Sequence, residues 1–231
     1  MILEMHDVHV NLGLSHVLQG VNLSIKPGET VGLFGRNGVG KTTIVKTIAG
    51  WHKPSQGKIL FQDQAIEALP PNEITRLGMG LVPEDRRIFP GLSVEGNLKL
   101  GLMQVHASER KAAEQRIQMV FERFPRLSER RNQSGTTLSG GEQQMLAMAR
   151  VLIGNPKLLL IDEPTEGLAP MVVADIFRLM DELKAQGISI LLIEQNIHKA
   201  IHLCDRHYVV ERGRVVLEGN SQDLEEQIGR A

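Results

Sequence analysis

The segment GRNGVGKTT, from Gly35 to Thr43, fits the pattern G-x-x-x-x-G-K-[ST], with Gly40, Lys41 and Thr42 at its last fixed positions. In such a loop the glycines let the backbone curl until successive N–H groups point at phosphate oxygens. The helix that follows adds the positive end of its dipole. The segment comes after the apolar run VGLFG and before a helix expected at 41–49. We therefore interpret it as a phosphate-binding loop.

The members of this loop have different expected tasks in binding a nucleoside triphosphate. The Lys41 ammonium is expected to reach the β- and γ-phosphates, and the Thr42 hydroxyl is expected to hold Mg²⁺. The remaining contacts to the nucleotide are expected from Gly35, Asn37, Gly38, Gly40 and Thr43.

The hydrophobic pattern predicts an α/β core around this loop. The runs within KLLLIDE (157–163) and ISILLIE (188–194) are uniformly apolar, which is typical of central parallel strands. A helix is expected between them at 172–185. The segments GKILFQ (57–62) and LGMGLVPE (77–84) predict two more strands.

Two further parts are expected beside the core. Residues 2–10 and 21–25 alternate apolar and polar side chains, which predicts an N-terminal antiparallel β subdomain with residues 2–10 as an edge strand. In the middle of the chain, apolar residues recur at helical spacing from Ser108, the expected N-cap, until Pro125 ends that helix. A second helix is expected from 140 to about 153.

These segments predict one domain over residues 1–231. Its core, with the β subdomain, is expected at 1–84 and 156–231, and a helical subdomain at 85–155. A chain of 231 residues is long enough to bury the core of such a domain.

The segment LLLIDEP, from Leu158 to Pro164, places two acids at the end of an apolar strand. Taken alone, it fits a buried strand with solvated acids at its end equally well. Beside a phosphate-binding loop, Asp162 is expected to bind Mg²⁺, and Glu163 is expected to orient and deprotonate the attacking water.

The segment LSGGEQQ, from Leu138 to Gln144, has two interpretations. Ser139 and Glu142 form the pattern S-x-x-E, a capping box that would start any helix. Alternatively, the Ser139 hydroxyl and the Gly140 and Gly141 amides form an anion site at the start of that helix.

The order of these motifs, followed by a TEGLAP loop, resembles the ATP-binding cassette (ABC) ATPases over essentially the whole chain. The resemblance implies a P-loop NTPase core with a mostly parallel sheet, and ATP and Mg²⁺ as cofactors. It also implies that two cassettes enclose two nucleotides head to tail, so that hydrolysis requires pairing. Ser139 and Gly141 would then face the γ-phosphate bound to the partner, and the loop at 166–169 would cross the seam between the subunits.

Three positions depart from the pattern common among such cassettes. Leu12 stands where many have an aromatic residue against adenine, so the base is expected to meet only Leu12 and Val17, with poor discrimination among bases. Glu84 replaces a common glutamine and is expected at Mg²⁺ or the attacking water, although an exposed loop acid is the alternative. Gln195 replaces a histidine and is expected to sense the γ-phosphate as a neutral amide, between Glu194 and Asn196.

The segments VPE, IEQN, TEGLAP and YVVERGRVVLEGN together resemble one importer branch, the shorter ATPase of branched-chain amino acid importers and relatives serving urea and short amides. The implied partners are a second ABC ATPase subunit, two transmembrane permease subunits and a periplasmic solute-binding protein. The implied location is cytoplasmic, on the inner face of the cell membrane through the permeases. A cytosolic ABC ATPase of translation or DNA repair is the alternative, and an ATP-gated clamp is a third.

Composition argues against several other classes. A net charge of −1 and 3% aromatic residues argue against a nucleic-acid partner, and no apolar run approaches the roughly 20 residues of a membrane helix. The single cysteine excludes an intrachain disulfide and fits a reducing compartment. A metal site at His198, His202, Cys204 and His207 is conceivable but lacks a fixed fourth ligand.

Overall fold

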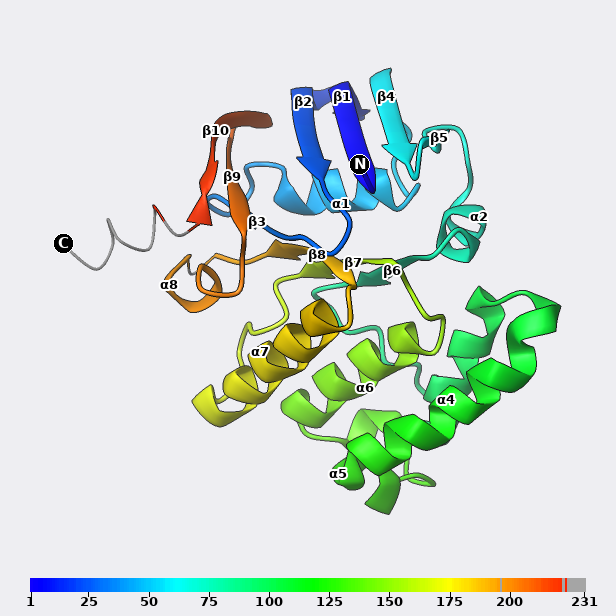
Figure 1. Ribbon diagram of the computed structural model, residues 1–231. Helices are drawn as coiled ribbons and strands as arrows, with labels where there is room; N and C mark the ends of the chain where they lie inside the picture. The colour runs from blue at the N-terminus through cyan, green and yellow to red at the C-terminus, as the bar shows by residue number, and fades with distance from the viewer. Residues whose placement is uncertain (196, 222, 224–231) are drawn as a thin grey trace.

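The computed structural model describes residues 1–195, 197–221 and 223. Its strands form two sheets, with helices between and below them (Figure 1). The strands are β1 (Leu3–Leu12), β2 (Ser15–Ile25), β3 (Thr30–Phe34), β4 (Gln56–Phe61), β5 (Gln64–Ala65), β6 (Met79–Val82), β7 (Leu158–Asp162), β8 (Ser189–Ile193), β9 (Arg206–Glu211) and β10 (Arg214–Asn220). The α-helices are α1 (Lys41–Ile48), α2 (Pro71–Arg76), α3 (Val94–Lys99), α4 (Arg110–Arg123), α5 (Pro125–Glu129), α6 (Gly140–Leu152), α7 (Pro170–Ala185) and α8 (Ile197–Ala200).

The larger sheet has the order β10-β9-β3-β8-β7-β6 and forms the core. All of its neighbouring strands run parallel except β9 and β10, which form an antiparallel pair. Every residue of β3, β7 and β8 is buried, because helices cover both faces of a parallel sheet. The expectation of central parallel strands is therefore confirmed. Parallel strands also bring their carboxyl ends to one edge, where the phosphate-binding loop begins.

The smaller sheet has the order β2-β1-β4-β5 and is antiparallel, as expected of the N-terminal subdomain. The prediction of an edge strand at residues 2–10 is wrong, because β1 lies between β2 and β4. Strand β4, which arrives from beyond α1, pairs with the side of β1 that the first hairpin leaves open. Helix α1 lies between the two sheets (Figure 1), and its Ile44 and Ile48 belong to the hydrophobic core that joins them.

The middle of the chain is helical, and its helices pack around a separate apolar cluster that includes Leu98, Ile117, Phe121 and Leu146. Ser108 is not the N-cap that the sequence predicted. It lies in a short 3₁₀ turn at Ala107–Glu109, and α4 begins only at Arg110 without a side-chain cap. Proline fits the first turn of a helix, so Pro125 begins α5 directly after α4 ends. The boundaries at 85 and 155 remain predictions.

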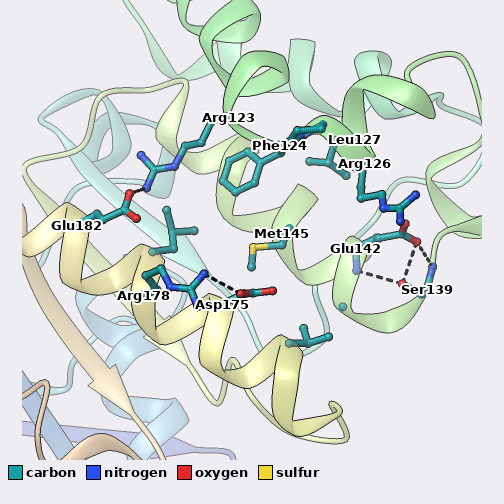
Figure 2. A pocket seen from close by; sticks show the side chains of 14 residues that line it. Arg123, Phe124, Arg126, Leu127, Ser139, Glu142, Met145, Asp175, Arg178 and Glu182 are labelled. Carbon is teal, nitrogen blue, oxygen red and sulfur yellow. Dashed lines mark hydrogen bonds and ion pairs between the residues drawn. The ribbon is translucent and has the colours of Figure 1, made fainter.

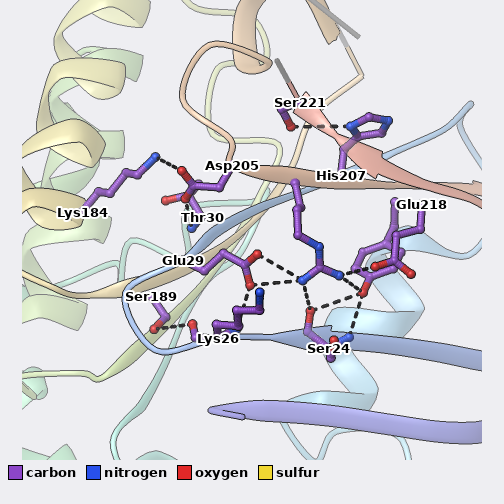
Figure 3. A network of polar contacts seen from close by, with 12 residues as sticks. Ser24, Lys26, Glu29, Thr30, Lys184, Ser189, Asp205, His207, Glu218 and Ser221 are labelled. Atoms are coloured by element: carbon purple, nitrogen blue, oxygen red, sulfur yellow. Dashed lines mark hydrogen bonds and ion pairs between the residues drawn. The ribbon is translucent and has the colours of Figure 1, made fainter. Parts of the chain in front are cut away.

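A polar network around Arg206 connects the two sheets. Figure 3 shows members of this network, including Ser24, Glu29 and Glu218. The Arg206 guanidinium, on β9, donates to both carboxylate oxygens of Glu29, at 3.1 and 3.3 Å. It also donates to the Tyr208 hydroxyl, which accepts from the Ser24 backbone N–H of β2 at 3.1 Å. Glu29 is buried, so the guanidinium is needed to compensate a carboxylate that water does not reach.

We expect Arg206→Met to lower the free energy of unfolding by about 3 kcal/mol, because it leaves the Glu29 carboxylate buried without its cation. Urea unfolding measures the change. The matched control is the double variant Glu29→Gln with Arg206→Met, which removes both charges and is expected to be more stable than the single variant. Equal stability of the two variants would contradict this account of the network.

Candidate nucleotide site

The site lies at the carboxyl edge of the larger sheet, where β3, β7 and β8 end beside one another. A cavity of about 340 Å³ opens there. It brings together most of the residues that the sequence predicted, although they are far apart in the chain. Its lining consists of Val17, Asn37, Gly38, Gly40, Lys41, Thr42, Thr43, Glu84, Glu163, Glu166 and Gln195.

Two glycines allow the loop after β3 to take its shape. Gly35 has φ of 150°, and a Cβ at this position would lie 2.4 Å from the Val210 carbonyl oxygen. Gly40 caps α1 with φ of 111°, a conformation that side chains with a Cβ rarely adopt. The loop can therefore pass close to β9 and turn directly into α1, so that the first amides of the helix face the cavity.

Lys41 is buried, with 4% of its surface exposed, and its ammonium group lies near three oxygen atoms. It donates to the carbonyl oxygens of Gly35 at 2.9 Å and Arg36 at 3.0 Å, and it lies 3.6 Å from Glu163 Oε1. These oxygens compensate a charge that would otherwise be costly to bury. Phosphate oxygens are acceptors of the same kind, so an entering nucleotide could replace them around the ammonium.

Glu163 is held in an unusual backbone conformation. Its φ is 46°, which is uncommon for a residue other than glycine, and its N–H donates to the Ile193 carbonyl of β8 at 3.0 Å. Its carboxylate accepts a hydrogen bond from Gln195 Nε2. Strand β8 therefore positions Glu163 through both its backbone and the side chain that follows it. The role of Gln195 at a γ-phosphate remains a prediction, and Asn196 lies outside the described residues.

Asp162 and Thr42 form the expected pair for a cation. The Thr42 hydroxyl donates to Asp162 Oδ1 at 3.3 Å. Asp162 is almost completely buried, and this burial, with the charges of Glu163 and Glu84, raises the pKa of its carboxyl group to about 6. The Thr42 hydrogen bond acts in the opposite direction. A carboxylate with a raised pKa gains from a nearby cation, which would favour its charged form.

Three more carboxylates meet at the mouth of the cavity. Oxygens of Glu84, Glu163 and Glu166 all lie within 4.8 Å of one another. Desolvation, together with the charges of Glu163 and Glu166, raises the pKa of Glu84. Carboxylate and hydroxyl oxygens are the ligands that Mg²⁺ prefers, so the residues present fit this ion. Sequence reasoning did not assign Glu166 to this cluster, because its motif placed it only in the loop of the subunit seam.

The signature residues lie elsewhere. Ser139 and Glu142 form the capping box, since Ser139 Oγ accepts from the Glu142 N–H at 3.3 Å and Glu142 Oε2 accepts from the Ser139 N–H at 2.9 Å. Ser139, Gly140 and Gly141 do not line the cavity at the loop. Ser139 and Gly141 instead border a pocket of about 470 Å³, which is lined by the end of α4 and by α5, α6 and α7 (Figure 2). A role of these residues at a phosphate remains a prediction.

The expected base contacts are only partly brought together. Val17 lines the cavity, whereas Leu12 lies at the end of β1 with 39% of its surface exposed and outside the cavity lining. The histidines of the conceivable metal site are not brought together either. The ring of His202 packs against Phe177, and His207 is buried beside Ser221. Among the described residues, the glutamate cluster is the one group of three or more metal-type ligands close together.

Known proteins are similar to this chain in sequence and in fold. The family profile described as ABC transporter matches residues 18–166. The high-affinity branched-chain amino acid transport ATP-binding protein BraG of Pseudomonas aeruginosa is 40% identical over 96% of this chain and 94% of its own length. The lipopolysaccharide export system ATP-binding protein LptB of Escherichia coli K12 is 34% identical over 90% of this chain and 86% of its own.

Among solved structures, a dimeric ATP-binding cassette in a post-hydrolysis state, bound to ADP and Pi, superposes with a TM-score of 0.83. It is 26% identical, and the match covers 95% of this chain and 98% of that one. In the part of the chain that the structure describes, no helix is long and apolar enough to cross a membrane.

We expect Glu163→Gln to bind ATP with an affinity within about threefold of the wild type but to lose at least about 100-fold in turnover, because a general base contributes roughly 10²–10⁴. Phosphate release and equilibrium binding measure the two quantities. Glu166→Gln is the matched control, since it removes a neighbouring charge of the same cluster without removing the base. Rapid turnover by Glu163→Gln would refute the assignment.

Asp162→Asn is expected to stabilise the metal-free protein at pH 7.5 by about 1–3 kcal/mol, because one unit of pKa corresponds to about 1.4 kcal/mol. The folded-state pKa of Asp162 is raised above its ordinary value, so its contribution to stability falls as pH rises from about 4 to about 6. The advantage of asparagine should therefore shrink towards zero near pH 4. Urea unfolding in EDTA tests this, and destabilisation by Asp162→Asn at pH 7.5 would contradict it.

Proposed function

This chain belongs to the ABC transporter family and is an ATPase, and from that premise we propose that it energises an importer of branched-chain amino acids or a similar small polar solute. The observation that carries the proposal is the similarity to BraG, which extends over nearly the whole of both chains. In this proposal ATP binding, closure of a dimer of cassettes and hydrolysis are coupled to inward transport.

The positions of the site residues support the following proposed roles. The loop amides and Lys41 bind the phosphates of ATP. Water attacks the γ-phosphorus, its proton passes to Glu163, and the bond to the ADP oxygen breaks. Gln195, which contacts Glu163, keeps this carboxylate directed at the cavity. Thr42, Asp162 and Glu84 are the proposed ligands of Mg²⁺, which would stabilise the charge that develops on the phosphates.

Pairing of two cassettes is supported by the separation of the two halves of the site. Ser139 and Gly141 do not line the cavity of their own chain, and we propose that they contact a nucleotide bound by a partner instead. The similar cassette bound to ADP and Pi is dimeric. We propose that the partner is a second ABC ATPase subunit arranged head to tail with this one.

Membrane permeases are the proposed docking partners of the groove beside the Glu84 loop. The groove lies between the core and the helical segment, and its exposed apolar side chains include Trp51, Phe89 and Met103. Because a surface of this kind gains from being covered, it suits an apolar segment of a permease. The permeases would hold this chain at the cytoplasmic face of the membrane, and a periplasmic solute-binding protein would deliver the solute.

Export is the second candidate, because LptB is also similar over most of this chain. The two candidates share the ATPase site and differ in the membrane partners. The solute is therefore determined by subunits other than this one.

We expect a tagged chain, purified from detergent-solubilised membranes, to recover a second, different ATPase and two hydrophobic subunits. Cells carrying Glu163→Gln should take up radiolabelled leucine at a rate reduced at least about tenfold, because the coupled ATPase is inactive. Normal leucine uptake together with impaired lipopolysaccharide export would favour the second candidate. Recovery of ribosomal or repair proteins instead of membrane subunits would overturn a transport function.

A further inference from the structure

A strained turn connects the nucleotide cavity to the groove beside it. Glu84 lies in the cavity lining, Phe89 lies in the groove, and Arg86 and Arg87 form the turn between them. Both arginines have positive φ, 56° and 46°, a conformation that residues other than glycine adopt infrequently. Two such residues in succession persist only where their surroundings hold them.

The side chain of Arg150, on α6, stabilises this turn. Its guanidinium donates to the Arg87 carbonyl oxygen at 2.7 Å and to the Arg86 carbonyl oxygen at 3.1 Å, and it lies over the Phe89 ring at 5.2 Å. Only 7% of Arg150 is exposed, and this burial lowers the pKa of the guanidinium. The carbonyl oxygens of the strained turn therefore accept the hydrogen bonds that water would otherwise accept from this cation.

Asn97 of α3 holds the same turn from its other end. Its Oδ1 accepts from the Phe89 N–H at 2.9 Å and from Arg150 at 3.4 Å, and its Nδ2 donates to the Ser93 carbonyl at 3.0 Å. Asn97 is completely buried. Buried side chains of α3 and α6 therefore hydrogen-bond to the turn and hold it in place.

The two arginines of the turn extend in different directions. Arg86 Nη2 donates to the Glu166 carbonyl at 3.3 Å, and Arg86 Nη1 lies 3.3 Å from the place that a Cβ on Gly140 would occupy. The Arg87 guanidinium lies over the Trp51 ring at 4.2 Å. The turn thus contacts the backbone of Glu166, the start of α6 and the wall of the groove.

We propose that Arg150 is a positioning residue for ATP hydrolysis. It fixes the turn at 84–89 so that Glu84 faces the cavity, and it ties this carboxylate to the helix that begins with the signature residues. The proposal rests on the role proposed above for Glu84. If the helical segment moved relative to the core, Glu84 would move with it, because Arg150 links the turn to α6.

Trp51 is the only tryptophan of the chain, so its emission reports the position of the turn without any measurement of activity. In Arg150→Lys, which keeps the charge but loses the planar fork, we expect the Trp51 spectrum to shift towards that of Arg87→Ala, where the stacked cation is absent. We also expect kcat to fall about tenfold, with ATP affinity within about twofold of the wild type. The matched control is Arg116→Lys, which alters another arginine that donates to a backbone carbonyl, that of Ile153 at 2.7 Å, and should leave both readouts unchanged.

A wild-type Trp51 spectrum in folded Arg150→Lys would overturn the proposal, as would an equal loss of kcat in Arg116→Lys. If Arg150→Lys does not fold, it is replaced by Phe89→Leu, at the exposed end of the turn. Amide hydrogen exchange over residues 85–92 is expected to be faster in this variant. Exchange at the wild-type rate would contradict the proposal. The spectrum and the exchange rates test the hold on the turn alone. Rapid hydrolysis by Glu163→Gln, in contrast, would refute the catalytic role proposed for Glu163 while leaving this result intact.

Discussion

The nucleotide site depends on the burial of one ammonium group. Lys41 begins α1 directly after the glycine-rich loop, and almost none of its surface is exposed. Its charge is compensated by two loop carbonyls and by the Glu163 carboxylate, which arrive from β3 and β7. Because an uncompensated buried cation is costly, the loop, the strand ends and Glu163 have to be arranged together. Phosphates would enter by taking over acceptor positions that already exist.

In the proposed account, the site of a single chain lacks the signature residues of a partner. The core supplies the loop, the acids and Gln195 to one cavity, while the capped start of α6 borders a different pocket. Helix α6 nevertheless remains connected to the cavity through Arg150 and the turn that follows Glu84. In the proposed account, pairing would bring Ser139 and Gly141 of a partner to the γ-phosphate, whereas Arg150 would act on Glu84 through the turn.

Much of the fold and of the site could be predicted from the sequence, because the informative motifs are local. The phosphate-binding loop and the apolar strands that end in acids specify their own geometry, and the parallel sheet then brings their ends together. The position of β1 could not be predicted, since it depends on pairing with β4 after a long excursion of the chain. Tertiary contacts likewise determine the 3₁₀ turn before α4 and the contribution of Glu166. They also determine the hydrogen bonds of Arg150 to the two residues with positive φ.

The most direct test of the central claim is the structure of the Glu163→Gln variant with Mg-ATP bound. The account predicts that Lys41 Nζ leaves at least one of the Gly35 and Arg36 carbonyl oxygens and lies within hydrogen-bonding distance of a β- or γ-phosphate oxygen. It also predicts that Ser139 and Gly141 of a second subunit face the same γ-phosphate. A nucleotide bound elsewhere, with Lys41 still donating to both loop carbonyls, would contradict the account.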